Sequence, residues 1–160
     1  MSAKIKAVPE GFHTVTPCLS LKNSVKALEF YKKAFGAKVL DIFPSPDGKS
    51  TMHAVMQIGN SILMMGDENA GQNCRSAESL GASPIGLFIY VPDADAAFKQ
   101  AAAAGATVIM PVTDMFWGDR CGAVKDPFGY TWTIATHVRD LTRKEIEEGA
   151  LSFAAQAVKP

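Results

Sequence analysis

The chain has 160 residues, of which 48% are hydrophobic and 20% charged, and sixteen basic side chains balance sixteen acidic ones. This composition is typical of a globular chain long enough to bury a core, and it excludes extended disorder. Because the basic residues are scattered rather than clustered, we expect neither nucleic acid nor a membrane surface as a partner.

The three cysteines, Cys18, Cys74 and Cys121, lie far apart in the sequence. They form no CxxC motif or Cys/His pair that would bind zinc, and their odd number argues against the disulfide framework of a secreted protein. The N-terminus lacks the apolar core of a signal peptide, and no apolar stretch reaches the length of a membrane span. We therefore expect a cytoplasmic protein.

The first half of the chain predicts an arm, a strand, a helix and three further strands. Residues 1–12 are polar and predict a loose arm, and residues 13–21 predict a strand in which Pro17 cannot donate to a ladder. Asn23 or Ser24 then caps a helix, since apolar residues recur at helical spacing behind it. They are Val25, Leu28, Phe30, Tyr31 and Phe35. The next strands are predicted over residues 38–43, 50–58 and 61–65.

The second half repeats this order after a polar segment, 66–83, that shows no periodicity and indicates a lid or a linker. A strand is predicted over 85–91, and Asp93 caps a helix that ends at Ala104. Three more strands and a helical tail follow, and their predicted ranges are 107–112, 121–125, 131–135 and 142–157. The tail helix begins with a capping box formed by Thr142 and Glu145.

The two halves also resemble each other in sequence. LKNSVKAL at 21–28 is answered by VPDADAAF at 91–98, and FGAKV at 35–39 by AGATV at 104–108. A duplicated unit indicates two modules that share a core or build one site together. We predict an α+β fold of two tandem β-α-β-β-β modules that form a cupped mixed sheet, with a C-terminal helix. The predicted parts are an arm (1–12), the first module (13–67), a linker (68–83), the second module (84–138) and a tail (139–160).

Four motifs carry a family resemblance: LEFYKKAFG at 28–36, MHA at 52–54, IGNS at 58–61 and WGDRCGAVKDPFGYTW at 117–132. On these motifs and the paired modules, the chain resembles the vicinal oxygen chelate superfamily of glyoxalase I, bleomycin-resistance proteins and extradiol dioxygenases. Within it, the chain is similar to the PhnB-like branch. The resemblance covers about residues 13 to 140 and implies the fold. It implies no single activity, because the superfamily holds lyases, epimerases, dioxygenases and non-catalytic drug-binding proteins.

The resemblance also implies where a metal would bind, because the superfamily's enzymes place His or Gln ligands on the first strand of each module and Glu ligands on the last. The corresponding positions are Thr16, Gly86, Leu63 or Met64, and Thr133. None of these offers a suitable donor. His53 and Asp67 could approach each other, but two ligands make a poor site. We therefore expect no metal and no other cofactor, and a divalent metal is the alternative.

Without a metal, the cup would be a concave and mostly apolar pocket with a few polar groups. The residues predicted to line it are His53, Val55, Met64, Asp67, Tyr90, Trp117, Asp119, Arg120 and Trp132. The segment 117–120 offers an indole for stacking and an adjacent Asp/Arg pair that could bind a planar or charged ligand. As alternatives, the Asp/Arg pair braces a loop, Trp132 belongs to the core, and Asp67 caps a turn.

Period-two alternation sets the orientation of His53. It places Met52, Ala54 and Met56 under the helix, and His53, Val55 and Gln57 toward the cup.

Two functions are consistent with these residues. The first, which we favour, is a metal-independent small-molecule-binding protein of the resistance or sequestration kind, acting as a homodimer. The second is a divalent-metal-dependent, glyoxalase-like lyase or isomerase in which His53 is the catalytic base. A third role, as a dimer scaffold only, leaves the cluster at 117–120 unexplained.

Overall fold

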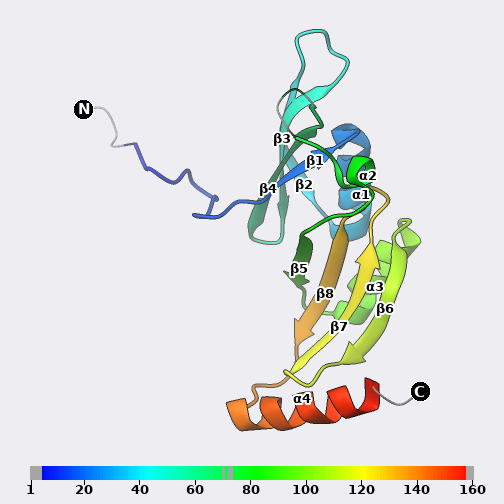
Figure 1. Cartoon of the computed structure of the whole chain (residues 1–160). Coiled ribbons are helices and arrows are strands. Elements are labelled where there is room, and N and C mark those ends of the chain that lie inside the picture. The colour runs from blue at the N-terminus through cyan, green and yellow to red at the C-terminus, as the bar shows by residue number, and fades with distance from the viewer. Residues whose placement is uncertain (1–4, 70, 72–73, 158–160) are drawn as a thin grey trace. The chain divides into compact units, whose positions relative to one another are not determined.

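The computed structural model describes residues 5–69, 71 and 74–157, and it divides the chain into two compact units (Figure 1). Unit 1 takes the residues up to 84 together with 127–130, and unit 2 takes 85–126 and the residues from 131 onward. Each unit holds one four-stranded sheet. The predicted α+β fold of two β-α-β-β-β modules with a C-terminal helix is thereby confirmed. The single cup that the modules would share stays a prediction.

The sheet of unit 1 has the order β1-β4-β3-β2, in which β1 runs parallel to β4 and the other pairs are antiparallel. Its strands are β1 (Cys18–Leu21), β2 (Lys38–Pro44), β3 (Thr51–Ile58) and β4 (Ser61–Asp67). Helix α1 (Ser24–Phe35) connects β1 to β2 and packs on β3. The side-chain oxygen of Asn23 accepts a hydrogen bond from the amide of Lys26 at 2.9 Å, which identifies Asn23 as the N-cap.

Helix α1 ends at Gly36, whose φ of +64° is a left-handed conformation that favours glycine. Its buried residues include Leu28, Phe30 and Tyr31, as the apolar spacing predicts. Val25 was predicted in the same stripe, but it is exposed. The reason is its position in the first turn, where Ser24 and not Val25 points inward.

The sheet of unit 2 repeats this topology with the order β5-β8-β7-β6, and β5 is parallel to β8. Its strands are β5 (Gly86–Tyr90), β6 (Thr107–Asp114), β7 (Asp119–Lys125) and β8 (Thr131–His137). Helix α3 (Ala94–Ala103) begins after Asp93, whose carboxylate accepts from the amide of Ala96 at 2.9 Å. The core lies between α3 and the sheet, where Val124, Trp132 and Ile134 are fully buried.

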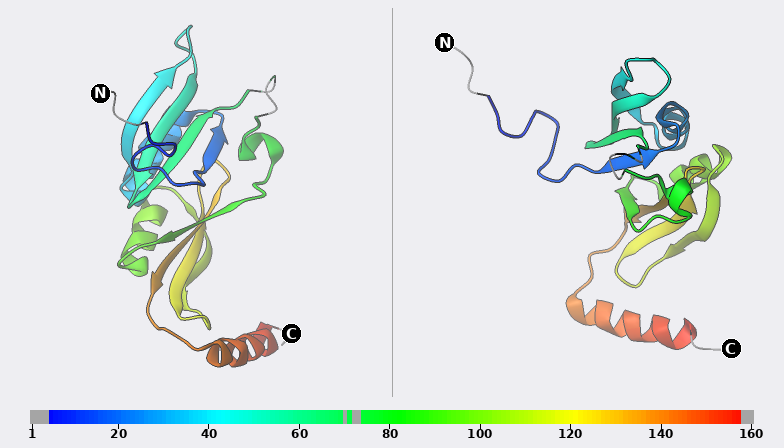
Figure 2. Two further views of the ribbon diagram at one scale, coloured as in Figure 1. Left: turned by 90° about the vertical axis from the view of Figure 1, so that its left-hand side faces the viewer. Right: turned by 45° about the horizontal axis from the view of Figure 1, so that its top comes forward.

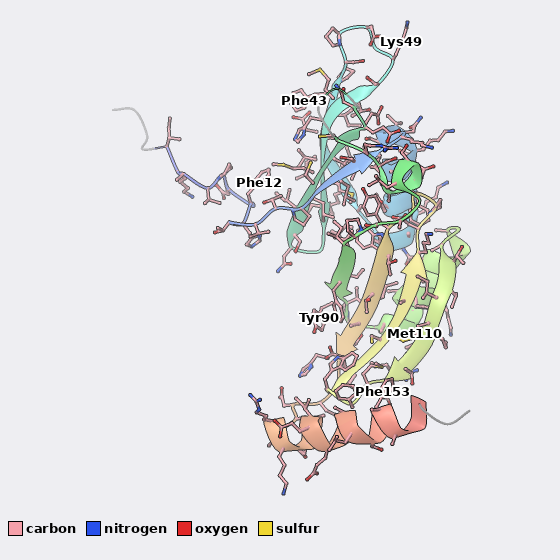
Figure 3. All side chains as sticks on the ribbon, viewed as in Figure 1. Phe12, Phe43, Lys49, Tyr90, Met110 and Phe153 are labelled. Atoms are coloured by element: carbon pink, nitrogen blue, oxygen red, sulfur yellow. The ribbon has the colours of Figure 1, made fainter. Side chains whose placement is uncertain are left out.

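Helix α4 (Arg143–Ala157) lies across the end of the unit 2 sheet at which β8 ends (Figures 1 and 2). The predicted capping box is present, because Glu145 accepts from the amide of Thr142 at 2.7 Å and the hydroxyl of Thr142 accepts from the amide of Glu145 at 3.3 Å. Phe153 points from α4 toward the sheet (Figure 3), and its ring centroid lies 5.7 Å from that of Phe116. Among the described helices, none is long and apolar enough to cross a membrane.

Two segments differ from the prediction. Residues 13–17 were predicted as part of the first strand, but β1 begins only at Cys18. Pro17 has no N–H to donate, and the hydroxyl of Thr16 turns back to the carbonyl of His13 at 3.1 Å. These residues therefore continue the arm, which runs away from the sheet of unit 1 (Figures 1 and 2).

The segment 66–83 was predicted as an irregular loop, but it contains the end of β4 and a short helix, α2 (Ala77–Leu80). Residues 70, 72 and 73 of this segment lie outside the described residues. The carboxylate of Glu68 accepts from the amide of Ser76 at 2.8 Å and from the hydroxyl of Ser79 at 2.7 Å. The backbone hydrogen bond from Ser76, followed by the side-chain one from Ser79, lowers the pKa of Glu68 to about 2.

The turn that joins β7 to β8 belongs to unit 1, although both strands belong to unit 2. The ring of Phe128 lies 5.9 Å from that of Phe30 and 6.1 Å from that of Tyr31. The hydroxyl of Tyr130 donates to the carbonyl of Ser20 at 2.8 Å. Residues 127–130 therefore complete the core of the first module from a distant part of the chain.

Candidate functional site

The β7–β8 ladder assigns each polar residue of β7 to one face of the unit 2 sheet. Asp119 pairs with His137, and Arg120 pairs with Thr136. Directly opposed residues share a face and neighbours along a strand alternate. Since Thr136 contacts the start of α3, Arg120 lies on the α3 side of the sheet. Asp119 and His137 lie on the other side, which we call the helix-free face.

Asp119 is the centre of a polar cluster on the helix-free face. Its side chain is only 3% exposed. Its Oδ1 lies 2.7 Å from Nδ1 of His137, and its Oδ2 accepts from the hydroxyl of Tyr90 at 3.0 Å and from Nε1 of Trp117 at 2.9 Å. Burial by itself raises the pKa of this carboxyl, but the hydrogen bonds from His137, Tyr90 and Trp117 outweigh it and lower the pKa. Asp119 is therefore a buried carboxylate with its charge retained.

His137 is half-exposed and lies between two carboxylates. Its Nε2 is 3.0 Å from Oδ1 of Asp140, while its Nδ1 faces Asp119. Both ring nitrogens donate only in the protonated imidazole. The hydrogen bond with Asp119, and then that with Asp140, raises the pKa of His137. The two carboxylates thus favour the protonated ring, and its contact with Oδ1 helps to orient Asp119.

Tyr90 is an exposed aromatic member of the cluster. It stands at the end of the edge strand β5 (Figure 3), and 64% of its surface is exposed. Its hydrogen bond to Asp119 raises the pKa of the phenol, so the hydroxyl keeps its proton. The ring of Phe88 lies on the same face, with its centroid 5.1 Å from that of Tyr90 at an angle of 45°. The two rings form an exposed aromatic pair.

Cys121 is buried on the helix-free face with Met115 and Ala135, and Trp117 packs against this group. Burial, and next the charge of Asp119, raises the pKa of the Cys121 thiol. A thiol in these surroundings stays protonated and is a poor nucleophile. Cys121 therefore contributes to the apolar packing beneath the polar cluster.

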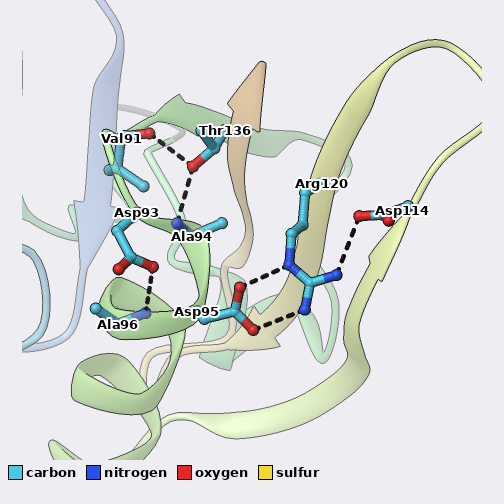
Figure 4. A network of polar contacts seen from close by, with 8 residues as sticks. All are labelled: Val91, Asp93, Ala94, Asp95, Ala96, Asp114, Arg120 and Thr136. Atoms are coloured by element: carbon cyan, nitrogen blue, oxygen red, sulfur yellow. Dashed lines mark hydrogen bonds and ion pairs between the residues drawn. The ribbon is translucent and has the colours of Figure 1, made fainter. Parts of the chain in front are cut away.

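The strand register separates Arg120 from the adjacent Asp119, with which it was predicted to bind a ligand. Figure 4 shows the Arg120 side chain between Asp95 and Asp114. The guanidinium donates from Nε and Nη2 to the carboxylate of Asp95 at 2.6 and 2.8 Å, and from Nη1 to Asp114 at 3.0 Å. The hydrogen bonds with Asp95, and then Asp114, raise the pKa of Arg120. The prediction is corrected: Arg120 braces α3 and β6, because consecutive strand residues point to opposite faces.

Trp132 is also corrected, from a pocket residue to a core residue. Its side chain is fully buried on the α3 side of the sheet. Its Nε1 donates to Oδ2 of the buried Asp126 at 2.8 Å. The indole is therefore not available to a ligand, in agreement with the alternative interpretation from the sequence.

In unit 1, three of the predicted residues share the face of the sheet that points away from α1. Val55 pairs with Met64, and His53 pairs with Phe43, whose ring centroid is 6.3 Å away. His53 is half-buried and Val55 is buried. The structure thus places His53, Val55 and Met64 together, but it does not test whether they bind anything.

Asp67 points to the opposite side of the unit 1 sheet. Its Oδ1 accepts from the amide of Ser24 at 2.6 Å and its Oδ2 from the amide of Thr51 at 2.9 Å. The carboxylate anchors the start of α1, so its predicted place in the pocket is corrected.

The predicted alternation along β3 holds only in part. Ala54 and Met56 are buried under α1, as expected, but Met52 is 65% exposed. The reason is that Met52 lies near the start of β3, and Leu40, Ile42 and Phe43 on the neighbouring edge strand are themselves exposed.

The residues present do not fit the metal site that the resemblance implies. The β4 register places Met64 on the face away from α1, and Leu63 faces the helix, which settles the uncertain position. Thr133 and Gly86 lie on the helix-free face of unit 2 and supply no imidazole or carboxylate. Within residues 5–69, 71 and 74–157, no group of three His, Cys, Asp or Glu side chains is arranged to hold a metal ion.

The sequence prediction missed two members of the polar cluster, His137 and Asp140, and also Phe88, whose ring lies against Tyr90. A signal for His137 was present in the hairpin register. With Lys125 opposite Thr131, counting six residues back and six forward along the ladder pairs Asp119 with His137. A histidine opposite a carboxylate in an antiparallel ladder indicates an ion pair.

The sequence matches a known protein family and a relative of similar length. Residues 13–134 match the family model of the Glyoxalase/Bleomycin resistance protein/Dioxygenase superfamily. An uncharacterized protein of Mycobacterium bovis is 38% identical over 136 residues, which cover 83% of this chain and 89% of that relative.

Solved structures of similar fold were also found. TioX from Micromonospora sp. ML1 is 23% identical with a TM-score of 0.60, over 81% of this chain and 100% of TioX. A gene product of Arabidopsis thaliana is 27% identical with a TM-score of 0.61, over 78% of this chain and 98% of that protein. The PhnB protein from Bacillus cereus is 16% identical with a TM-score of 0.61, over 78% of this chain and 99% of that protein. The likenesses to TioX and PhnB show the fold alone.

Proposed function

Because the chain belongs to the glyoxalase/bleomycin resistance protein/dioxygenase superfamily, we propose that it binds a small organic molecule without a metal ion. The proposed site is the helix-free face of unit 2. One observation carries the proposal: Phe88 and Tyr90 form an exposed aromatic pair, and the hydroxyl of Tyr90 donates to the buried carboxylate of Asp119. Exposed aromatic surface next to a few fixed polar groups is the usual composition of a ligand site.

The chemistry of the cluster favours binding over turnover. A general base needs a free lone pair and a pKa near the working pH. Both ring nitrogens of His137 are engaged by carboxylates, and both oxygens of Asp119 accept hydrogen bonds. The buried Cys121 thiol is protonated. These groups are arranged to stay in place, which suits a rigid binding surface.

The alternative is a divalent-metal-dependent lyase or isomerase with His53 as its catalytic base. It needs metal donors that the superfamily positions in this chain do not supply, so we place it second. His53 would act from the face of unit 1 that also holds Val55, Met64 and Phe43. Its test is the metal dependence of ligand binding.

The proposed function is tested by titrating the protein with planar aromatic probes, with and without EDTA. We expect binding to persist in EDTA and to weaken about fivefold in Phe88→Ala, since a lost aromatic contact costs on the order of 1 kcal/mol. Phe153→Ala on α4 is the matched control, because Phe88 and Phe153 are 49% and 50% exposed. Stoichiometric metal in the purified protein, together with loss of binding in EDTA, would favour the metal-dependent alternative.

We also propose that the protein acts as a homodimer. Edge strands leave unpaired backbone groups that invite pairing with another chain. The edge strands β2 and β6 carry exposed apolar side chains, namely Leu40, Ile42, Val108 and Ile109. Light scattering coupled to size exclusion should give twice the mass of one chain, and a monomer mass across the concentration range would refute the dimer.

A further inference from the structure

The hydroxyl of Tyr90 has a fixed direction. Asp119 is ionised and can only accept, so the phenolic proton lies on the 3.0 Å line between the two oxygens. A hydroxyl has one proton, and what remains at the exposed Tyr90 oxygen is acceptor capacity. Asp119 cannot rotate to release that proton, because Trp117 and His137 hold its two oxygens from other directions.

The net charge around the Tyr90 hydroxyl is negative, which favours a ligand with a positively charged hydrogen-bond donor. Two carboxylates, Asp119 and Asp140, flank one imidazolium, His137, which leaves one net negative charge in the cluster. The guanidinium of Arg120 does not offset it locally, because it lies on the α3 side and is bound to Asp95.

The aromatic pair Phe88 and Tyr90 also favours a cationic ligand. The faces of Phe88 and Tyr90 carry the negative part of their ring quadrupoles, and both rings are about half or more exposed. Such faces attract cations and planar groups and repel anions. The hydroxyl, the net charge and the rings therefore all favour a planar cation that can donate a hydrogen bond.

We infer that Tyr90 is a specificity-determining residue that makes this face prefer planar ligands with a hydrogen-bond donor, protonated aromatic amines above all, over planar anions. This inference rests on the proposed binding function and names its ligand class. Asp119 and His137 act as positioning residues, since they reach the ligand only through the direction they impose on the Tyr90 hydroxyl.

The test compares two fluorescent probes with the same three-ring size and opposite charge: 9-aminoacridine, a cation with an amino donor at neutral pH, and anthracene-9-carboxylate. We expect the full-length protein to bind 9-aminoacridine at least about tenfold more tightly, as a hydrogen bond to a charged group implies. Tyr90→Phe keeps the ring and removes the acceptor, and it should reduce that preference severalfold. Phe153→Ala should keep it.

The outcomes separate this inference from the function on which it rests. If the anion binds as tightly as the cation, or if Tyr90→Phe leaves the preference unchanged, the inference is wrong while the binding function stands. If the wild-type protein binds neither probe, both are wrong. The wild-type comparison needs no variant, so it decides the ligand class even if Tyr90→Phe fails to fold.

Discussion

Gly122 on β7 provides a test of how closely α3 packs on the unit 2 sheet. A Cβ built at this position would lie 2.7 and 2.8 Å from Cε2 and Cδ2 of Phe98 on α3, and 3.0 Å from Cγ2 of Val112 on β6. Carbon atoms pack favourably at about 3.5–4.0 Å. The added methyl group of Gly122→Ala would therefore overlap a rigid ring and a β-branched side chain.

The size of the effect follows from two opposing contributions. Overpacking a filled site costs about 1–3 kcal/mol. Replacing glycine by alanine in an ordinary conformation returns about 0.4–1 kcal/mol by restricting the unfolded chain. We expect a net loss of about 1.5 kcal/mol in the free energy of unfolding for Gly122→Ala.

The assay is urea unfolding followed by far-ultraviolet circular dichroism. Gly86→Ala in β5 is the matched control, because the nearest atom to its added Cβ is the carbonyl oxygen of Thr131 at 4.0 Å. That variant should be neutral or slightly stabilised. Adding Phe98→Leu to Gly122→Ala should recover at least about 0.5 kcal/mol through coupling of the two sites. If Gly122→Ala unfolds at the wild-type urea concentration and shows no such coupling, the packing argument is refuted.

Four further predictions concern the contacts of His137, Phe128 and Trp132. Asp140→Asn should lower the pKa of His137 measured by NMR titration, and an unchanged titration curve would remove Asp140 from the cluster. Because the His137 pKa is raised on folding, its contribution to stability should be fully present below about pH 6.5 and lost as the pH rises through the folded value. Phe128→Ala should cost about 2 kcal/mol in chemical unfolding, since a half-buried ring contacts two rings of α1. Trp132→Phe should cost about 1–3 kcal/mol by removing the donor to the buried carboxylate of Asp126, and an unchanged stability would contradict that hydrogen bond.

Local patterns in the sequence were sufficient for helices α1, α3 and α4 and for most of the strands. Asn23 and Asp93 were recognised as helix caps because a side-chain oxygen three residues before an orphan amide has few other roles. The short helix α2 was not predicted, because its four residues are too few to show an apolar period, although Ser76 caps it locally by accepting from the amide of Ser79 at 3.2 Å. The extent of β1 was overestimated because β-rich composition outweighed the missing donor of Pro17.

The candidate site was predicted less well, for a reason of geometry. Asp119 and Arg120 were treated as one pair because they are adjacent in sequence, yet adjacent strand residues point to opposite faces. The partner of Asp119 is instead His137, eighteen residues later, and the ladder register links them. Trp132 could not be assigned to core or pocket until the contact with Asp126 fixed its face. Residue type identified the chemistry, but strand pairing decided which groups act together.

The turn at 127–130 has a consequence for how the protein is made on the ribosome. Unit 1 is composed of residues up to 84, but its core also contains Phe128, and Tyr130 bonds to its first strand. The nascent chain must therefore grow by a further 130 − 84 = 46 residues before the first module can close. At about 5–20 residues per second, that interval is roughly two to nine seconds. During synthesis, the core of unit 1 is therefore completed only after most of the second module has been made.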